Sequence, residues 1–377
     1  MKPQVNLIRL IITIMILLIL FPDAKDAFLD ITSSAESLSD FAPEELRGDY
    51  KWISEIDYSP DGKYIAVLSF SNRPIVLQDK NGSDYLIKDE TYSLSGLRFS
   101  SDSNYLLISS NKYDSSKKEY NKSHLILYSV TNKSIIRTHE MENNYISEIA
   151  FSSDGRYYAS PYRKCDDSGK CTVNIWSVNS GEIIQSITSE NYQAQALTFT
   201  QDSKYLVVSY DGSGYSSDNT VFYGVDSGDV YRTLNGVYAF DLQFSDDGKV
   251  LVGENGDGEG LLVWDTDTYK QIARFTDISS PNDISLSPDG KYLMANDYYA
   301  LMIWDLSTKK QILRTKVNNL DYADQFYTAK FSADGQQILI GLEVSEDSIY
   351  SMNSRAHSGR IFAYNFTEIV ETYYQEH

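Results

Sequence analysis

The sequence predicts an all-β fold, on three observations: a hairpin pattern that recurs seven times, the spacing of its copies, and further strand patterns behind each hairpin. In each copy apolar and polar residues alternate up to a tight turn and resume directly after it, which is typical of two antiparallel strands. Asp and Gly suit the turn, because Asp caps its own backbone and Gly adopts positive φ freely. The copies begin at Ile56, Leu97, Ile149, Leu197, Leu242, Ile284 and Ala329.

The spacing of the turn aspartates is 41 to 52 residues. Such a period, with four strands to a unit, is typical of propeller blades and is longer than that of leucine-rich repeats. The segments between hairpins are rich in Tyr, Val, Ile, Ser and Thr and show no sustained helical stripe, which argues against helical arrays. We therefore expect a single seven-bladed β-propeller of four-stranded antiparallel blades. The turn aspartates are Asp61, Asp102, Asp154, Asp202, Asp247, Asp289 and Asp334.

Behind the hairpins the chain shows a third strand, such as MIWDL at Met302 to Leu306, and then a fourth. The SPDGKY turns together with Trp264-Asp265 and Trp304-Asp305 resemble the WD-repeat (WD40-like) β-propeller family over residues 50–374, in particular divergent bacterial exported members. The resemblance implies a propeller that serves as an interaction module. The family's Gly-His pair is missing and Trp176 is followed by Ser. The family's Asp-His-Ser-Trp network is therefore not carried over, and we expect apolar packing alone to hold the blades.

The N-terminus carries Lys2 and Arg9, followed by twelve apolar residues or threonine up to Phe21. This run fits a signal peptide and is shorter than the ~20 residues that span a bilayer. We expect residues 1–27 to be a signal peptide, and the alternative is an uncleaved signal anchor at residues 7–21. Either way the protein would be exported, to a periplasmic, extracellular or cell-surface location. Any membrane contact would come from this segment only.

Two interpretations remain open for how the ring closes. Residues 28–49 are expected to be an extended lead-in to the propeller at 50–374, whose last blade would take its fourth strand from Thr367 to Tyr374. Alternatively, a strand from the lead-in completes the last blade.

The net charge of −20 excludes the usual nucleic-acid partners, because such a surface repels phosphate backbones. It fits an acidic, soluble, monomeric protein outside the cell, and the sharper alternative is a basic partner. The two cysteines, Cys165 and Cys171, bracket a short polar loop. In an oxidising compartment they predict one disulfide, and two ligands are too few for a metal site.

The loops between second and third strands differ in length, whereas the turns between first and second strands are uniformly tight. The two sets lie on opposite faces of a propeller. Variation on one face predicts a surface that binds a protein or peptide partner, and drift in unconstrained loops is the alternative.

The connections into the first strands open on the same variable face and carry two recurrences. An aromatic residue precedes the strand in five repeats, and a carboxylate lies three residues before the strand aromatic in four. Together they would form a rim at the channel mouth that suits a cation, a Lys/Arg-rich peptide or a sugar. The alternative is aromatic packing between blades and solvated acids. The residues are Trp52, Tyr92, Tyr145, Tyr192 and Tyr238, with Glu55, Glu148, Asp241 and Asp283.

We expect no catalysis and no cofactor. The sequence lacks the Gly-x-Ser-x-Gly elbow and the sialidase Asp box, and its four Trp are few for a quinone-dependent dehydrogenase. The enzyme alternative is a cation-dependent lactonase-type hydrolase, with a divalent metal on the four channel-mouth carboxylates acting as a Lewis acid. Calcium is a weak further possibility at residues 254–260 and 165–171, which lack the ligand spacing of a calcium loop.

Overall fold

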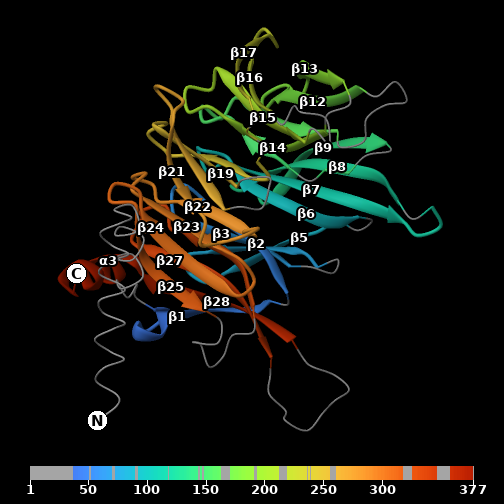
Figure 1. Cartoon of the computed structure of the whole chain (residues 1–377). Helices are drawn as coiled ribbons and strands as arrows, with labels where there is room; N and C mark the ends of the chain where they lie inside the picture. Colours follow the sequence, from blue (N-terminus) through green and yellow to red (C-terminus); the bar gives the residue numbers. More distant parts are fainter. Residues whose placement is uncertain are drawn as a thin grey trace, which may run out of the picture.

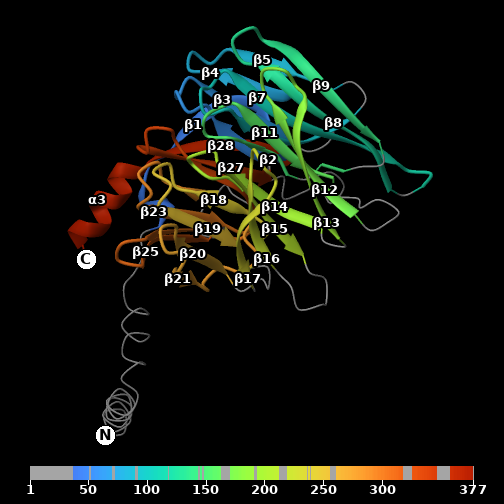
Figure 2. The ribbon, with the colours of Figure 1, turned by 90° about the horizontal axis from the view of Figure 1, so that it is seen from above.

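The described part of the chain forms seven four-stranded antiparallel sheets that surround a central channel, which confirms the seven-bladed β-propeller (Figures 1 and 2). The first strands of neighbouring blades contact one another around the whole ring, including the contact between the first blade and the seventh. The computed structural model describes residues 37–50, 52–69, 73–89, 92–117, 119–142, 145–146, 148–162, 170–190, 193–211, 219–235, 237, 239–254, 260–316, 325–345 and 357–376.

Six of the blades follow chain order from the channel outwards. Blades one to three contain β2 (Ile53–Tyr58), β3 (Tyr64–Ser69), β4 (Ile75–Asp79), β5 (Asp84–Ile87), β6 (Ser93–Phe99), β7 (Tyr105–Asp114), β8 (Glu119–Ser129), β9 (Ser134–Glu142), β10 (Ala150–Phe151), β11 (Tyr157–Pro161), β12 (Lys170–Ser177) and β13 (Ile183–Glu190). Blades four to six contain β14 (Gln193–Phe199), β15 (Tyr205–Asp211), β16 (Asn219–Gly224), β17 (Val230–Asn235), β18 (Leu242–Phe244), β19 (Val250–Glu254), β20 (Leu261–Asp265), β21 (Gln271–Phe275), β22 (Asp283–Leu286), β23 (Tyr292–Asn296), β24 (Ala300–Asp305) and β25 (Lys310–Lys316).

The same hydrogen bonds close the first turn of every blade. In blade one the Ser59 hydroxyl donates to Asp61 Oδ1 (2.8 Å) and accepts the Tyr64 N–H (2.9 Å). Gly62, which follows Asp61, has a φ of 68°, a left-handed conformation that Gly adopts without steric cost. The recurring hydroxyl and Asp of the sequence are therefore a turn-closing device. Its seven pairs are Ser59–Asp61, Ser100–Asp102, Ser152–Asp154, Thr200–Asp202, Ser245–Asp247, Ser287–Asp289 and Ser332–Asp334.

The seventh blade closes the ring with a strand from the lead-in. Its order is β1 (Glu44–Tyr50), β28 (His357–Asn365), β27 (Gln337–Ser345) and β26 (Gln325–Phe331). β1 pairs antiparallel with β28, and the Arg360 side chain of β28 donates to Glu45 Oε1 of β1 at 2.5 Å. Of the two interpretations left open by the sequence, the lead-in strand is therefore the correct one.

The expected strand at 367–374 is wrong, because these residues belong to the helix α3 (Phe366–Glu376). Three apolar side chains, Phe366, Ile369 and Tyr373, recur at helical spacing and are buried. The Asn365 side chain accepts the Glu368 N–H (3.2 Å), as an N-cap does. The strands of the propeller thus run from Glu44 to Asn365, rather than filling the predicted range 50–374.

Helix α3 packs on the end of the propeller that carries the tight turns. The Phe366 ring lies edge-on against Tyr292 (5.0 Å) and Phe331 (4.9 Å), and the Tyr374 hydroxyl donates to Asp305. The tip of the β7–β8 hairpin lies at the opposite end of the molecule (Figures 1 and 2). The two ends therefore differ in what covers them.

The core lies between neighbouring sheets, where the Phe275 ring of blade five stacks on Trp304 of blade six at 5.0 Å. The buried Trp304 indole N–H has no hydrogen-bond partner among the described residues, so this Trp contributes by packing. The expectation that apolar packing alone holds the blades is nevertheless wrong. The Asp61 N–H donates to the Ser103 hydroxyl of blade two (3.0 Å), and His139 of blade two bonds the Tyr158 hydroxyl of blade three (2.7 Å).

Two predictions concern the chain outside the described residues. Residues 1–27 and Cys165 both lie there, so the signal segment and the disulfide stay predictions. Cys171 is buried in β12. Within the described ranges, no helix has the length and apolar character needed to cross a membrane.

Candidate binding site at the channel mouth

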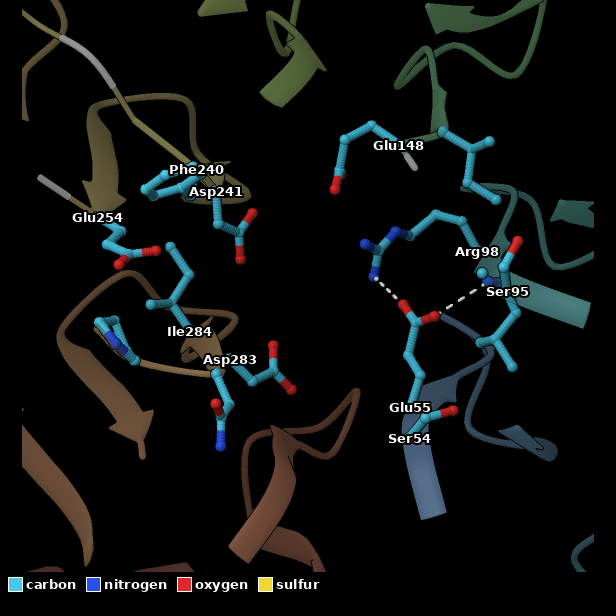
Figure 3. A pocket seen from close by; sticks show the side chains of 15 residues that line it. Ser54, Glu55, Ser95, Arg98, Glu148, Phe240, Asp241, Glu254, Asp283 and Ile284 are labelled. Atoms are coloured by element: carbon cyan, nitrogen blue, oxygen red, sulfur yellow. Dashed lines mark hydrogen bonds and ion pairs between the residues drawn. The ribbon is translucent and has the colours of Figure 1, made fainter. Parts of the chain in front are cut away.

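The four predicted carboxylates line one cavity of about 320 Å3 at the channel mouth (Figure 3). Each stands three residues before the aromatic or Leu of its first strand, so the ring of blades brings equivalent positions together. The same position holds the smaller residues Gly96, Ala196 and Thr328 in the other blades. The carboxylates that meet here are Glu55, Glu148, Asp241 and Asp283.

Three of the five predicted rim aromatics lie within the described chain, and their places differ from those of the carboxylates. Trp52, Tyr92 and Tyr145 are not among the residues that line the cavity. The Tyr92 ring packs against His124 (3.8 Å), and the Tyr145 ring packs against Tyr120 (4.6 Å). Both partners lie on β8, so these rings pack on the third strand of blade two.

Of the other predicted aromatics, Trp52 is 41% exposed, and Tyr192 and Tyr238 lie outside the described residues. The aromatic residue that does line the cavity is Phe240, which directly precedes Asp241 and is 44% exposed. Counting from the strand aromatic would have found it, because Phe240 stands one residue before the carboxylate position.

Two basic side chains in the channel were not predicted. The Arg98 guanidinium lies 3.5 Å from Glu55 Oε1, and Lys330 Nζ lies 2.5 Å from Asp283 Oδ1. Both bases directly precede the strand aromatic, two residues after the carboxylate position, and alternate residues of a strand share a face. The alternation of side chains along the strand could therefore have predicted that these two bases face the channel.

A second cavity of about 200 Å3 continues along the channel. It shares Arg98, Glu148 and Asp241 with the mouth and adds Asp57 and Lys330. The channel is therefore lined by charged groups over more than one layer, with acids in the majority.

Some of these polar side chains join neighbouring blades. Glu55 Oε2 accepts the Leu97 N–H (3.1 Å), and Asp57 Oδ2 accepts the Phe99 N–H (2.9 Å). Asp283 Oδ2 accepts the Thr328 hydroxyl (2.7 Å). Glu55, Asp57 and Asp283 therefore hold neighbouring blades together whether or not a ligand binds.

Burial shifts the protonation of the mouth acids. It raises the pKa of Glu55 to about 7, although the Arg98 charge opposes the shift. The pKa of Glu254 is also raised to about 7, first by burial and then by the neighbouring Asp241 carboxylate. Burial raises the pKa of Asp241 as well. The mouth thus contains acids with raised pKa values, and shifted pKa values are common at functional sites.

The arrangement fits a metal ion poorly. Among the residues that the structure describes, no three His, Cys, Asp or Glu side chains are grouped closely enough to hold one. Glu55 and Glu148 lie on one side of the cavity and Asp241 and Glu254 on the other (Figure 3). Carboxylates spread in this way suit separate N–H donors of a larger cation better than a single ion.

Comparisons with known proteins identify the fold. No protein-family model and no curated protein sequence matches the chain. A solved structure, the Myceliophteria thermophila Cps50 (Swd1) β-propeller domain, matches with a TM-score of 0.64 and 10% identity, over 85% of this chain and 98% of that one. At this identity the similarity concerns the fold alone. The chain therefore has a seven-bladed β-propeller fold similar to the fold of that domain.

Proposed function

We propose that the chain is an exported, non-catalytic scaffold whose loop face binds a protein or peptide partner. The loop face is the end of the propeller that carries the connections between second and third strands and the channel mouth. Fold similarity to a propeller domain and the absence of a recognisable catalytic motif support this role by analogy.

The contrast between the two ends of the blades carries the proposal. At the turn end every blade has the same hydroxyl–Asp hydrogen bond. At the loop end the strands differ: β7 and β8 have 10 and 11 residues, whereas β3 and β4 have 6 and 5. Figure 1 shows the β7–β8 hairpin projecting past its neighbours. Projecting, unequal hairpins around a concave mouth suit recognition of a large partner.

The N-terminal apolar run supports export, because its length and basic flank are those of a signal segment. Cell fractionation with N-terminal sequencing tests this part. We expect the mature chain outside the cytoplasm, beginning after residue 27 or retaining an anchor at residues 7–21. A cytoplasmic chain that keeps its N-terminus would contradict export and leave the binding proposal in place.

The lactonase-type alternative has one observation in its favour, since the four predicted carboxylates do meet in one cavity. Arg98 and Lys330 weaken it, because each is paired with one of those four acids. Elemental analysis of the purified protein separates the two functions. One tightly held divalent ion per chain favours hydrolysis, and none favours the scaffold.

The binding proposal is tested by shortening the blade-seven loop. Ser345 of β27 pairs with His357 of β28, so an Asn-Gly linker can replace residues 346–356 and close the hairpin without disturbing either strand. We expect a partner captured from the cell envelope or medium by the full chain, and then purified, to bind the shortened chain at least about tenfold more weakly.

The control variant is Asp226→Asn, in an exposed turn at the opposite end. Its affinity for the purified partner should equal that of the full chain. Equal affinity of the loop-shortened chain, or failure of every captured protein to bind directly when purified, would overturn the proposal.

A further inference from the structure

One side of the channel-mouth cavity carries a carboxylate that nothing in the described chain neutralises. Glu254, the last residue of β19, is 7% exposed, and its side chain points into the cavity (Figure 3). Among the described residues its carboxylate has no hydrogen-bond or ion-pair partner. A buried acid without a partner is unfavourable, so this side chain indicates a missing cation.

A second acid lies next to it. The Glu254 N–H donates to the Asp241 carbonyl (3.3 Å), which holds the two residues side by side at the mouth. The other acids differ, because Arg98 pairs with Glu55 and Lys330 pairs with Asp283. The charges of Lys330 and Arg98 also act to lower the pKa of Asp241, but neither acts on Glu254. Glu254, next to Asp241, is therefore the acid that is left to a ligand.

The dimensions of the site select among cations. The cavity of about 320 Å3 lies at the lower end of the ~300–1,000 Å3 range of small-molecule sites. It is far larger than one metal ion needs, and the described acids do not group around a single point. Phe240 adds an exposed ring beside Asp241, which can lie against an alkyl chain or face a cation.

We propose that the Asp241–Glu254 side of the channel mouth binds an organic cation, namely an ammonium or guanidinium group on an alkyl chain. The inference rests on the proposed function, because it names the chemistry that the binding face accepts. A Lys or Arg side chain of a bound peptide and a free polyamine both carry this chemistry. Their N–H groups would donate to the two carboxylates while the chain lies against Phe240.

The proposal predicts proton release on binding. Burial and the Asp241 charge raise the pKa of Glu254 to about 7, so part of it is protonated at neutral pH. A bound cation favours the ionised form and lowers that pKa. Affinity should therefore rise between pH 6 and pH 8. The charged groups that share this cavity and the one beyond it are Glu55, Asp57, Arg98, Glu148, Asp241, Asp283 and Lys330.

Titration calorimetry on the full chain tests the proposal with four probes: acetyl-Gly-Arg-Gly-amide, the matching Lys peptide, the matching citrulline peptide, and spermidine. Citrulline has the shape of arginine without its charge. We expect at least one cationic probe to bind and the citrulline peptide not to bind. Glu254→Gln should weaken binding at least about tenfold and abolish the rise with pH.

Two further variants complete the test. Asp241→Asn should weaken binding like Glu254→Gln, and Asp267→Asn, an exposed acid in the β20–β21 turn, should leave binding unchanged. Thermal melting verifies that each variant is folded. Binding of a peptide but not of spermidine supports a partner side chain as the ligand, and the reverse supports a free polyamine.

The proposal is overturned if no cationic probe binds, if citrulline binds as well as arginine, or if Glu254→Gln binds normally. If a cationic probe binds but no purified protein binds directly, the scaffold function is contradicted and the cation site is supported. A verified partner without probe binding would do the opposite.

Discussion

The carboxyl groups at the two ends of the propeller have pKa values shifted in opposite directions. At the turn end hydrogen bonds from the Ser332 hydroxyl and the Gln336 N–H hold the pKa of Asp334 below its usual value, and the six equivalent aspartates are lowered too. At the mouth burial raises the pKa of Glu55, Glu254 and Asp241.

The difference separates acids whose ionised form is stabilised by hydrogen bonds from acids whose ionised form is disfavoured by burial. A turn aspartate receives several N–H and O–H donors and so stabilises the blade in its ionised form. Glu254 at the mouth is buried and receives no hydrogen bond from the described residues, which costs free energy unless a cation is near. The repeat unit therefore carries a stabilising acid at the turn end and, in blades one and five, acids at the mouth whose ionised form burial disfavours.

The largest expected effect comes from removing the cation that the mouth already has. Arg98→Met leaves the Glu55 and Asp57 carboxyls without their first counter-charge. Because the Arg98 side chain is 37% exposed, we expect a loss of about 3 kcal/mol, at the lower end of the range for buried pairs. Urea unfolding at pH 8 measures the loss. The double variant Arg98→Met/Glu55→Gln should recover part of it. An unchanged unfolding free energy in the single variant would contradict the role of Arg98 as counter-charge.

The second prediction concerns opposite pH dependences. The Glu254 pKa of about 7 lies above its usual 4.5, so the folded chain binds the extra proton and stability falls as pH rises from about 4.5 to about 7. Glu254→Gln should flatten this fall by up to about 3 kcal/mol. The turn aspartates have lowered pKa values, so their contribution is lost as pH falls below their usual 3.8.

Urea unfolding of the wild type and of Glu254→Gln across pH 3 to pH 8 measures both pH dependences, the one from Glu254 and the one from the turn aspartates. The Asp267→Asn variant is the control for a change of charge alone. Stability that rises from pH 5 to pH 7 in the wild type, or a fall that Glu254→Gln leaves intact, would mean that the mouth acids are not held protonated.

The smallest effects compare the two ends directly. Ser332→Ala removes the hydroxyl that donates to Asp334 (2.6 Å) and accepts the Gln337 N–H (2.9 Å), which should cost about 1–3 kcal/mol. Tyr299→Ala at the loop end removes a 67% exposed ring and should change stability by less than about 0.5 kcal/mol. Thermal melting of both variants suffices. Equal losses would erase the distinction between the ends.

The fold was predictable because the repeat is local. The Ser-x-Asp turn and the alternating strands recur within each blade, so the seven hairpins could be counted without knowledge of distant contacts. The last blade was harder. The outer partner of β28 is β1, nearly the whole chain away. Helix α3 contains Ile, Val, Thr and Tyr residues that also suit a strand. In the folded protein the Phe366 ring at the start of this helix packs on Tyr292 and Phe331, which are distant contacts that the local sequence does not reveal.

The site was predictable in part for the same reason. Glu55 and Asp241 stand at equivalent repeat positions, so counting from the strand aromatic brought them together. Glu254 escaped because it ends a second strand and reaches the mouth only through the fold. The position of Tyr92 could not be predicted, because a residue outside a strand has no fixed side-chain direction, and its ring packs on His124.

The pairing of β1 with β28 has a consequence for how the protein is made and handled. Strand β1 is synthesised long before β28, so its backbone groups stay without their strand partner until nearly all of the chain has been made. A shortened or tagged chain that disturbs Glu44–Tyr50 would expose the edge of β28, and one molecule could then lend its β1 to the open blade of another. Such exchanged dimers would form without any change to the loop face.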